Sequence, residues 1–163
     1  MLIGLAALAC GPSRASDLDE VAVQVRTRFP EVRQVSVAEL ERRLEGPRPP
    51  VLLDVREPAE YEVSHLPGAR LATDLPRALD ALRGVERDQP IVVYCSVGYR
   101  SSELAEKLAA TGYTAVANLE GSIFAWANSG RPVYRDGEVV GRVHPYDRTW
   151  GRLLEPDLRA PID

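Results

Sequence analysis

The residues around Cys95 have the types and the spacing that nucleophilic sulfur chemistry requires. Residues 91–94 form a short apolar run typical of a buried strand, and Cys95 follows it directly. Ligands in open α/β sheets bind beyond the carboxyl ends of the strands, so this position favours a reactive cysteine. Arg100 adds a positive charge a few residues later, and a nearby cation stabilises thiolate over thiol. We therefore predict that Cys95 is a nucleophile with a lowered pKa.

The segment from Cys95 to Arg100 has the composition of an anion-binding loop. Gly98 permits a tight turn, and a helix is expected to begin near Ser101. The backbone N–H groups of this loop and the N-terminus of the helix would point at the sulfur. A buried, inert cysteine would explain neither the glycine nor the adjacent cation. The predicted binding residues are Ser96, Val97, Gly98, Tyr99, Arg100 and Ser101.

Strand-like runs and helical stretches alternate along the sequence and form the scaffold that positions this loop. The alternation predicts an α/β fold with a central, mostly parallel sheet and helices on both faces. The expected strands are residues 51–55, 91–94 and 115–117, and the expected helices are residues 16–29, 36–44, 75–82, 101–110 and 122–128.

Charged residues near the end of the first expected strand are predicted to support the loop. Asp54 lies at the sheet edge that carries Cys95, where its carboxylate could accept hydrogen bonds that hold the loop. Arg56 and Glu60 suit an ion pair that braces their own segment. We interpret this pair as structural support that takes no part in the chemistry.

After residue 130 the pattern changes to that of a hairpin followed by a tail. Residues 132–140 contain Asp136-Gly137 between two short apolar runs, which is a strong signal for a two-residue turn. The tail is expected to pack back on the domain through one helical stripe. That stripe consists of Tyr146, Trp150, Leu153 and Leu154.

The composition is that of a globular protein and excludes several classes. The chain has 163 residues, of which 45% are hydrophobic and 27% charged, so it fits one core and is not largely disordered. A net charge of −4 argues against a nucleic-acid partner bound through a basic field. Cys10 and Cys95 lie far apart and form neither a disulfide framework nor a metal-binding motif. We expect no metal and no organic cofactor.

Three segments in the correct order resemble the rhodanese-like domain family. The first segment reads DVREPAEY at residues 54–61 and continues as HLPGA at residues 65–69. The second is the loop CSVGYRS at residues 95–101, and the third is EGSIFAW at residues 120–126. Three ordered motifs are far more specific than the loop alone. The resemblance covers roughly residues 35–134.

This resemblance implies a rhodanese-like fold and a single-domain sulfurtransferase without a cofactor. The Cys95 thiolate would take the sulfane sulfur of thiosulfate or a persulfide and pass it to a nucleophilic acceptor. Donor and acceptor would be small molecules or proteins. The loop contains a single cation, so a persulfide donor is favoured over highly charged thiosulfate. His65 resembles a structural histidine of the family. Ser64 and Ser122 stand where the family usually has glycine, which affects the local backbone but not the nucleophile.

Two functions of other classes remain open at this point. Cysteine-dependent phosphatases and arsenate reductases also use a cysteine–arginine anion loop. Their loop is one residue longer than the four residues between Cys95 and Arg100. The second alternative is a binding module that docks a partner without turnover, and the intact Cys95 argues against it.

The N-terminus has features of a bacterial lipoprotein signal. Its first nine residues are uncharged and almost wholly apolar, and small residues precede Cys10. Lipidation of Cys10 would anchor the protein to a membrane outside the cytoplasm. A cytoplasmic location is the alternative, since no basic residue precedes Cys10. The predicted organisation is a leader and tether at 1–16, a helical extension at 17–34, a rhodanese-like domain at 35–134, and a hairpin and helical tail at 135–163.

Overall fold

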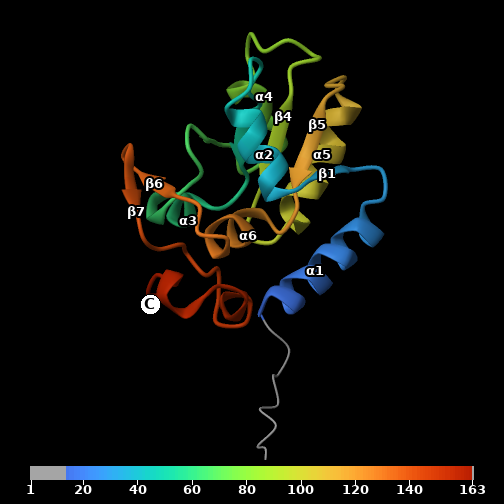
Figure 1. Cartoon of the computed structure of the whole chain (residues 1–163). Helices are drawn as coiled ribbons and strands as arrows, with labels where there is room; N and C mark the ends of the chain where they lie inside the picture. Colours follow the sequence, from blue (N-terminus) through green and yellow to red (C-terminus); the bar gives the residue numbers. More distant parts are fainter. Residues whose placement is uncertain (1–13, 163) are drawn as a thin grey trace, which may run out of the picture.

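A five-stranded parallel sheet forms the centre of the computed structural model, which describes residues 14–162 (Figure 1). The strands lie in the order β1-β5-β4-β2-β3, and every neighbouring pair is parallel. All residues of β4 are buried because it lies in the middle of the sheet, which explains its continuous apolar run. The strands are β1 (Arg33–Val35), β2 (Val51–Asp54), β3 (Arg70–Leu71), β4 (Ile91–Tyr94) and β5 (Val116–Leu119).

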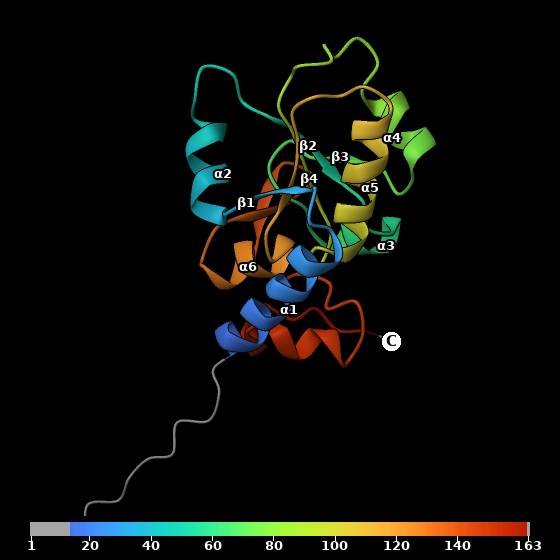
Figure 2. The ribbon, with the colours of Figure 1, turned by 90° about the vertical axis from the view of Figure 1, so that its right-hand side faces the viewer.

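Helices cover both faces of the sheet, as predicted. Helices α4 and α5 pack on one face around Leu53 and Val93, and α2 and α6 pack on the other around Leu52 and Val92 (Figure 2). Neighbouring strand residues therefore supply opposite halves of the core. The helices are α1 (Arg14–Arg28), α2 (Val37–Leu44), α3 (Pro58–Val63), α4 (Leu75–Ala81), α5 (Tyr99–Ala110) and α6 (Ser122–Asn128).

Helix α2 begins with one half of a capping box, as the Ser36–Glu39 spacing favours. The Ser36 hydroxyl accepts a hydrogen bond from the Glu39 N–H at 3.1 Å. A complete capping box that the sequence analysis missed opens α3, where Glu57 and Glu60 each accept from the other's backbone N–H. Strands β1 and β3 were also missed, because they are too short to carry a periodic pattern.

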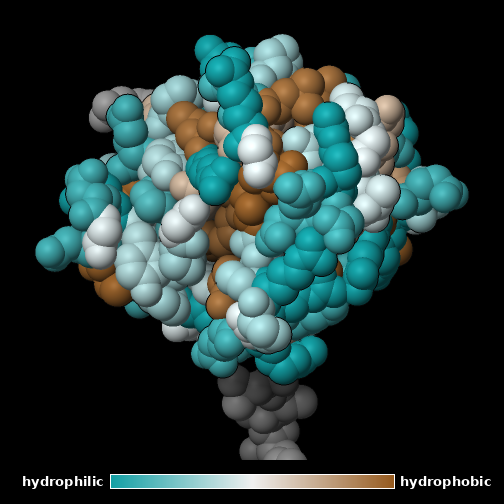
Figure 3. Space-filling model, turned by 90° about the horizontal axis from the view of Figure 1, so that it is seen from above, coloured by the Kyte–Doolittle hydropathy of each residue, from teal (hydrophilic) through white to brown (hydrophobic). Residues whose placement is uncertain are grey.

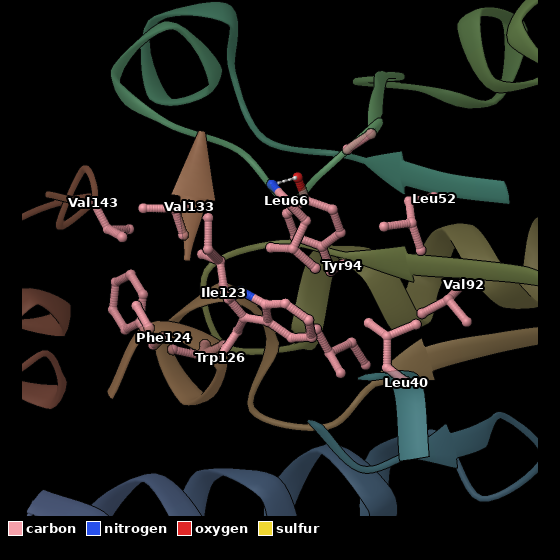
Figure 4. Close-up of a cluster of buried hydrophobic side chains, with 14 of the residues drawn as sticks. Leu40, Leu52, Leu66, Val92, Tyr94, Ile123, Phe124, Trp126, Val133 and Val143 are labelled. Carbon is pink, nitrogen blue, oxygen red and sulfur yellow. Dashed lines mark hydrogen bonds between the residues drawn. The ribbon is translucent and has the colours of Figure 1, made fainter. Parts of the chain in front are cut away.

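The predicted hairpin is confirmed. Strands β6 (Val133–Arg135) and β7 (Glu138–Val140) pair antiparallel around Asp136-Gly137. Val133 of β6 and Val143 of the tail lie beside Phe124 of α6 and extend the core beyond the sheet (Figure 4).

The tail packs back on the domain as predicted, but the predicted helical stripe is wrong. The tail forms two short 3₁₀ helices, η1 (Trp150–Leu153) and η2 (Pro156–Leu158). Tyr146 precedes them with a φ of 67° and is 47% exposed, whereas Leu154 is fully buried. The positive φ of Tyr146 explains the difference, because a residue in this conformation cannot belong to a right-handed helix that continues to Leu154.

Helix α1 and the tail lie together at the carboxyl edge of the sheet (Figures 1 and 2). Leu18 of α1 is buried in the same core cluster as Leu154 of the tail. Arg26 of α1 forms an ion pair with Glu120, directly after β5. The opposite end of the molecule is mostly hydrophilic, with hydrophobic side chains between the polar ones (Figure 3). The carboxyl edge of the sheet is therefore the one that the chain's flanking segments cover.

The predicted lipidation site, Cys10, lies outside the described residues. Within residues 14–162 no helix combines the length and apolarity that a membrane span requires. The lipid anchor and the segment boundaries drawn from the sequence stay predictions.

Candidate active site

Cys95 lies directly after β4, at the carboxyl edge of the sheet, and is 2% exposed. A pocket of about 200 Å³ reaches it. Four of the predicted loop residues line this pocket with Cys95, namely Ser96, Val97, Tyr99 and Arg100. Two tail residues, Tyr146 and Trp150, complete the lining. The predicted loop thus surrounds the cysteine. The sequence analysis did not predict that tail residues line the same pocket.

The surroundings of Cys95 favour the thiolate. The Gly98 N–H donates to Cys95 Sγ at 3.1 Å, and Ser101 Oγ lies 3.4 Å from the same sulfur. Burial raises the pKa of the thiol, but the Arg100 charge and these hydrogen bonds outweigh it, so the pKa of Cys95 is lowered. Gly98 precedes α5 with a φ of 120°, a conformation that side chains rarely adopt. Its lack of a side chain lets the loop turn its amide toward the sulfur.

Arg100 is held by a buried carboxylate. Its Nη1 and Nη2 donate to the two Glu60 oxygens at 2.8 and 2.9 Å, and Nη2 also donates to Ser96 Oγ at 3.0 Å. Ser96 Oγ in turn donates to Glu60 at 3.0 Å. Burial raises the pKa of Glu60, but the bonds from Arg100 and the Glu57 N–H reverse this, so its pKa is lowered. The guanidinium is therefore fixed in orientation and largely neutralised.

The ion pairs around β2 correct the sequence analysis. Arg56 pairs with Asp54 at 2.7 Å and donates to the Ser64 carbonyl at 2.6 Å. The expected Arg56–Glu60 pair is replaced, because Glu60 turns toward Arg100. The hydrogen bonds of Asp54 go to the Arg56 backbone and side chain rather than to the loop. Asp54 and Arg56 thus brace the chain between β2 and α3.

Ser122 holds the backbone of Cys95, a role that the sequence analysis missed. Its hydroxyl accepts from the Cys95 N–H at 3.1 Å and donates to the Leu119 carbonyl at 3.2 Å. Ser122 adopts a positive φ of 52°. The next two amides, of Ile123 and Phe124, bind the carbonyls of residues 95 and 96. The signal available in the sequence for this role was the serine itself, because the family usually has glycine at this position.

Asn118 is a second residue that the sequence analysis missed. It is fully buried near the end of β5, and its Oδ1 lies 2.5 Å from Ser101 Oγ. Its amide nitrogen donates to Gln34 Oε1 at 2.7 Å. A hydroxyl has one proton, so Asn118 and Cys95 compete for that of Ser101. A buried amide in an apolar strand was the signal that could have found it.

His65 has a structural environment. Its ring stacks on Tyr61 with centroids 4.1 Å apart, and Nδ1 lies 3.0 Å from the Leu66 carbonyl. His65 is absent from the pocket lining. Within the part of the chain that the structure describes, no group of His, Cys, Asp and Glu is arranged to hold a metal ion.

Comparison with known proteins identifies the family to which this chain belongs. A family model for the rhodanese-like domain matches residues 36–129, more than half of the chain. The chain belongs to the rhodanese-like domain family. The match contains Cys95, Arg100 and Glu60 and ends before the hairpin and tail. Two residues of the pocket wall, Tyr146 and Trp150, therefore lie outside the part that the family model covers.

Two curated relatives carry sulfurtransferase in their names. The chain is 36% identical over 104 residues to a sulfurtransferase of Allochromatium vinosum, covering 63% of this chain and 94% of that protein. It is 32% identical over 102 residues to the probable adenylyltransferase/sulfurtransferase MoeZ of Mycobacterium tuberculosis, covering 60% of this chain. That match spans a quarter of the MoeZ length. The family is therefore one of sulfurtransferase type.

A solved structure shows the same fold over a larger part of the chain. The thiosulfate sulfurtransferase of Pseudomonas aeruginosa superposes with a TM-score of 0.62 and covers 86% of this chain and 26% of that one. The sequences are 18% identical. This similarity confirms the rhodanese-like fold that the motifs imply.

Proposed function

We propose that this protein is a sulfurtransferase that carries a sulfane sulfur on Cys95. The observation that carries the proposal is the placement of Cys95 Sγ at the bottom of an anion-binding loop. One loop amide and one hydroxyl approach the sulfur, at 3.1 and 3.4 Å, and Arg100 lies beside them. The same groups can hold the terminal sulfur of a persulfide, which also carries a negative charge at neutral pH.

The reaction needs two displacements on sulfur. The Cys95 thiolate attacks the outer sulfur of a donor R–S–SH, the donor S–S bond breaks, and R–S⁻ leaves and takes up the hydropersulfide proton. Cys95 then carries S–S⁻. An acceptor thiolate attacks the outer sulfur, the new S–S bond breaks, and the Cys95 thiolate is regenerated. No oxidant and no general base are required once the thiolate exists.

A persulfide fits this site better than thiosulfate does. Thiosulfate brings two negative charges, and the loop offers the Arg100 cation to meet them. The Arg100 charge is already compensated by Glu60 through two hydrogen bonds. A dianion would therefore approach the thiolate with little electrostatic gain. We propose that a low-molecular-weight or protein-bound persulfide is the donor.

The same ion pair argues against phosphatase or arsenate chemistry. In that chemistry an arginine must grip two oxygens of a tetrahedral anion. Arg100 instead directs Nη1 and Nη2 at Glu60. The loop is also one residue shorter than in cysteine-dependent phosphatases. Sulfur transfer is therefore the activity that the loop supports best.

Intact-mass spectrometry after exposure to thiosulfate or glutathione persulfide tests the proposal. We expect the gain of one sulfur atom, located on Cys95 by peptide mapping and removed by cyanide. Cys95→Ser should gain no sulfur and transfer none, with an unchanged circular dichroism spectrum. Hydrolysis of aryl phosphates by the native protein that is lost in Cys95→Ser would overturn the assignment. Full sulfur transfer by Cys95→Ser would also do so.

A further inference from the structure

The tail forms part of the pocket although it lies outside the family match. Tyr146 and Trp150 line the pocket together with Cys95 and its loop. Neither residue supplies a charge or touches the reacting sulfur through a hydrogen bond. Their contribution is an aromatic wall beside the nucleophile, which makes them candidates for a role in choosing the substrate.

Hydrogen bonds and buried side chains hold the tail in place beside the pocket. Asn128 at the end of α6 donates to the Leu153 carbonyl at 2.7 Å and accepts from the Glu155 N–H at 3.0 Å. Val143 exchanges backbone hydrogen bonds with Leu158 and Ala160, at 2.7 and 2.9 Å. Buried Val143 and Leu154 anchor the same segment in the core. The positions of Tyr146 and Trp150 are therefore set by the fold.

Tyr146 is held over Arg100 at the cost of an uncommon backbone conformation. The guanidinium carbon of Arg100 lies 4.9 Å from the centroid of the Tyr146 ring. The φ of 67° at Tyr146 is costly for a side chain of this size. Such a conformation persists only where the surroundings fix it, here through the Tyr146 N–H bond to His144 at 3.0 Å.

Trp150 forms the second part of the aromatic wall. Its ring meets the Tyr99 ring edge-on, with centroids 6.4 Å apart and an interplanar angle of 64°. The Tyr99 hydroxyl donates to Gln24 Oε1 of α1 at 3.1 Å. Asp147 Oδ1 accepts from the Trp150 N–H at 2.8 Å and fixes the start of η1. Both flanking segments of the chain thus support this aromatic contact.

The charges of the pocket complement the aromatic wall. The Cys95 thiolate, Arg100 and Glu60 together carry one net negative charge. A donor with negative groups next to its sulfane sulfur is repelled by that charge. A donor with an apolar or aromatic group at that place gains contact area against Tyr146 and Trp150 instead.

We propose that Tyr146 and Trp150 select the sulfur donor and restrict it to small organic persulfides whose sulfur is attached to an apolar or aromatic carbon group. This inference rests on the proposed sulfur transfer at Cys95. The step is the one given above, with R as an arylalkyl or alkyl group that leaves as R–S⁻ and is protonated by the hydropersulfide proton. The pocket of about 200 Å³ admits one such group beside the sulfur.

The test compares benzyl hydropersulfide, glutathione persulfide and thiosulfate as donors, with cyanide as acceptor and thiocyanate as the readout. In the full chain, benzyl hydropersulfide should give the highest kcat/KM. Tyr146→Ala and Trp150→Ala should each lower kcat/KM for this donor by about tenfold, and the ratio of this kcat/KM to that for thiosulfate should fall by about fivefold or more. Tyr146→Phe and Trp150→Phe keep a ring and should retain the preference.

Tyr134→Ala provides the matched control, because Tyr134 lies in β6 and does not line the pocket. Tyr146 is 47% exposed, so its replacement should leave the melting temperature nearly unchanged. Equal losses with all three donors, or an unchanged donor preference in folded Tyr146→Ala and Trp150→Ala, would overturn the inference and leave sulfur transfer standing. A native protein that accepts sulfur from none of the donors would remove the proposed function itself.

Discussion

Arg100 and Glu60 face each other in a two-point ion pair, with N–O distances of 2.8 and 2.9 Å, beside Cys95. Glu60 is 3% exposed, so its carboxylate depends on this cation. The cation next to the nucleophile is therefore also the counterion of a buried acid. Electrostatics at the sulfur and stability of the fold are coupled through one pair of side chains.

Glu60→Gln is expected to destabilise the protein by about 1–3 kcal/mol at pH 7, because charged hydrogen bonds become neutral ones. The folded-state pKa of Glu60 is lowered. Its stabilisation is therefore fully present above the unfolded value near 4.3 and is lost as the pH falls through the lower folded-state pKa. Urea unfolding measures this effect. The difference in unfolding free energy between the variant and the native protein should be smaller at about pH 3 than at pH 7.

Glu62→Gln is the control, since Glu62 lies in the same helix and is exposed. It should change the stability little at either pH. Glu60→Gln should also lower the pKa of Cys95 further, because the Arg100 charge is then no longer compensated. An equal effect of the two substitutions at pH 7 would contradict the assigned role of Glu60.

Ser101→Ala is expected to raise the pKa of Cys95, because a hydrogen bond to the thiolate is lost. Ser102→Ala is the matched control, since Ser102 is the next residue, is equally buried, and has a hydroxyl without a partner. The pH dependence of alkylation by iodoacetamide measures the pKa of Cys95 in both variants. In the native protein the midpoint should lie below the ordinary thiol value. A midpoint that moves equally in both variants would show that the Ser101 hydroxyl does not act on the sulfur.

Gly98→Ala is expected to slow sulfur transfer and to cost about 1–3 kcal/mol of stability. The added carbon would lie 3.3 Å from the Asn118 amide nitrogen and 3.6 Å from Val25, in addition to the strained φ. Gly112 also has a positive φ, of 97°, but its surroundings are open. Gly112→Ala should therefore reduce the unfolding free energy without slowing transfer in single-turnover assays. A native transfer rate in folded Gly98→Ala would show that the loop amide is dispensable.

The sequence predicted the parts of this structure that depend on local pattern. Buried strands such as β4 are readable because both of their faces are apolar. The start of α2 at Ser36 and the turn at Asp136-Gly137 follow from side-chain and backbone preferences of single residues. The loop around Cys95 could be located because strand, glycine and cation follow one another in the chain.

The parts that it did not predict depend on distant partners. Glu60 pairs with Arg100 across forty positions, whereas the sequence favoured the nearby Arg56. Ser122 and Asn118 reach the catalytic loop only because α6 and β5 are placed beside it. Tyr146 lacks the helical conformation expected of it, and its place over Arg100 follows from how the tail is fastened. Such relationships are fixed by the packing of the sheet edge.

The residues that carry the proposed chemistry and the aromatic wall that selects the donor lie in different segments of the chain. The nucleophile and its loop lie within residues 36–129, whereas the residues that shape the entrance lie after them. A fragment cut at the family boundaries would keep Cys95 but lose one side of its pocket and uncover Phe124 and Trp126. Exchange of the C-terminal segment alone would therefore be a route by which evolution or design retargets such a protein without altering its catalytic loop.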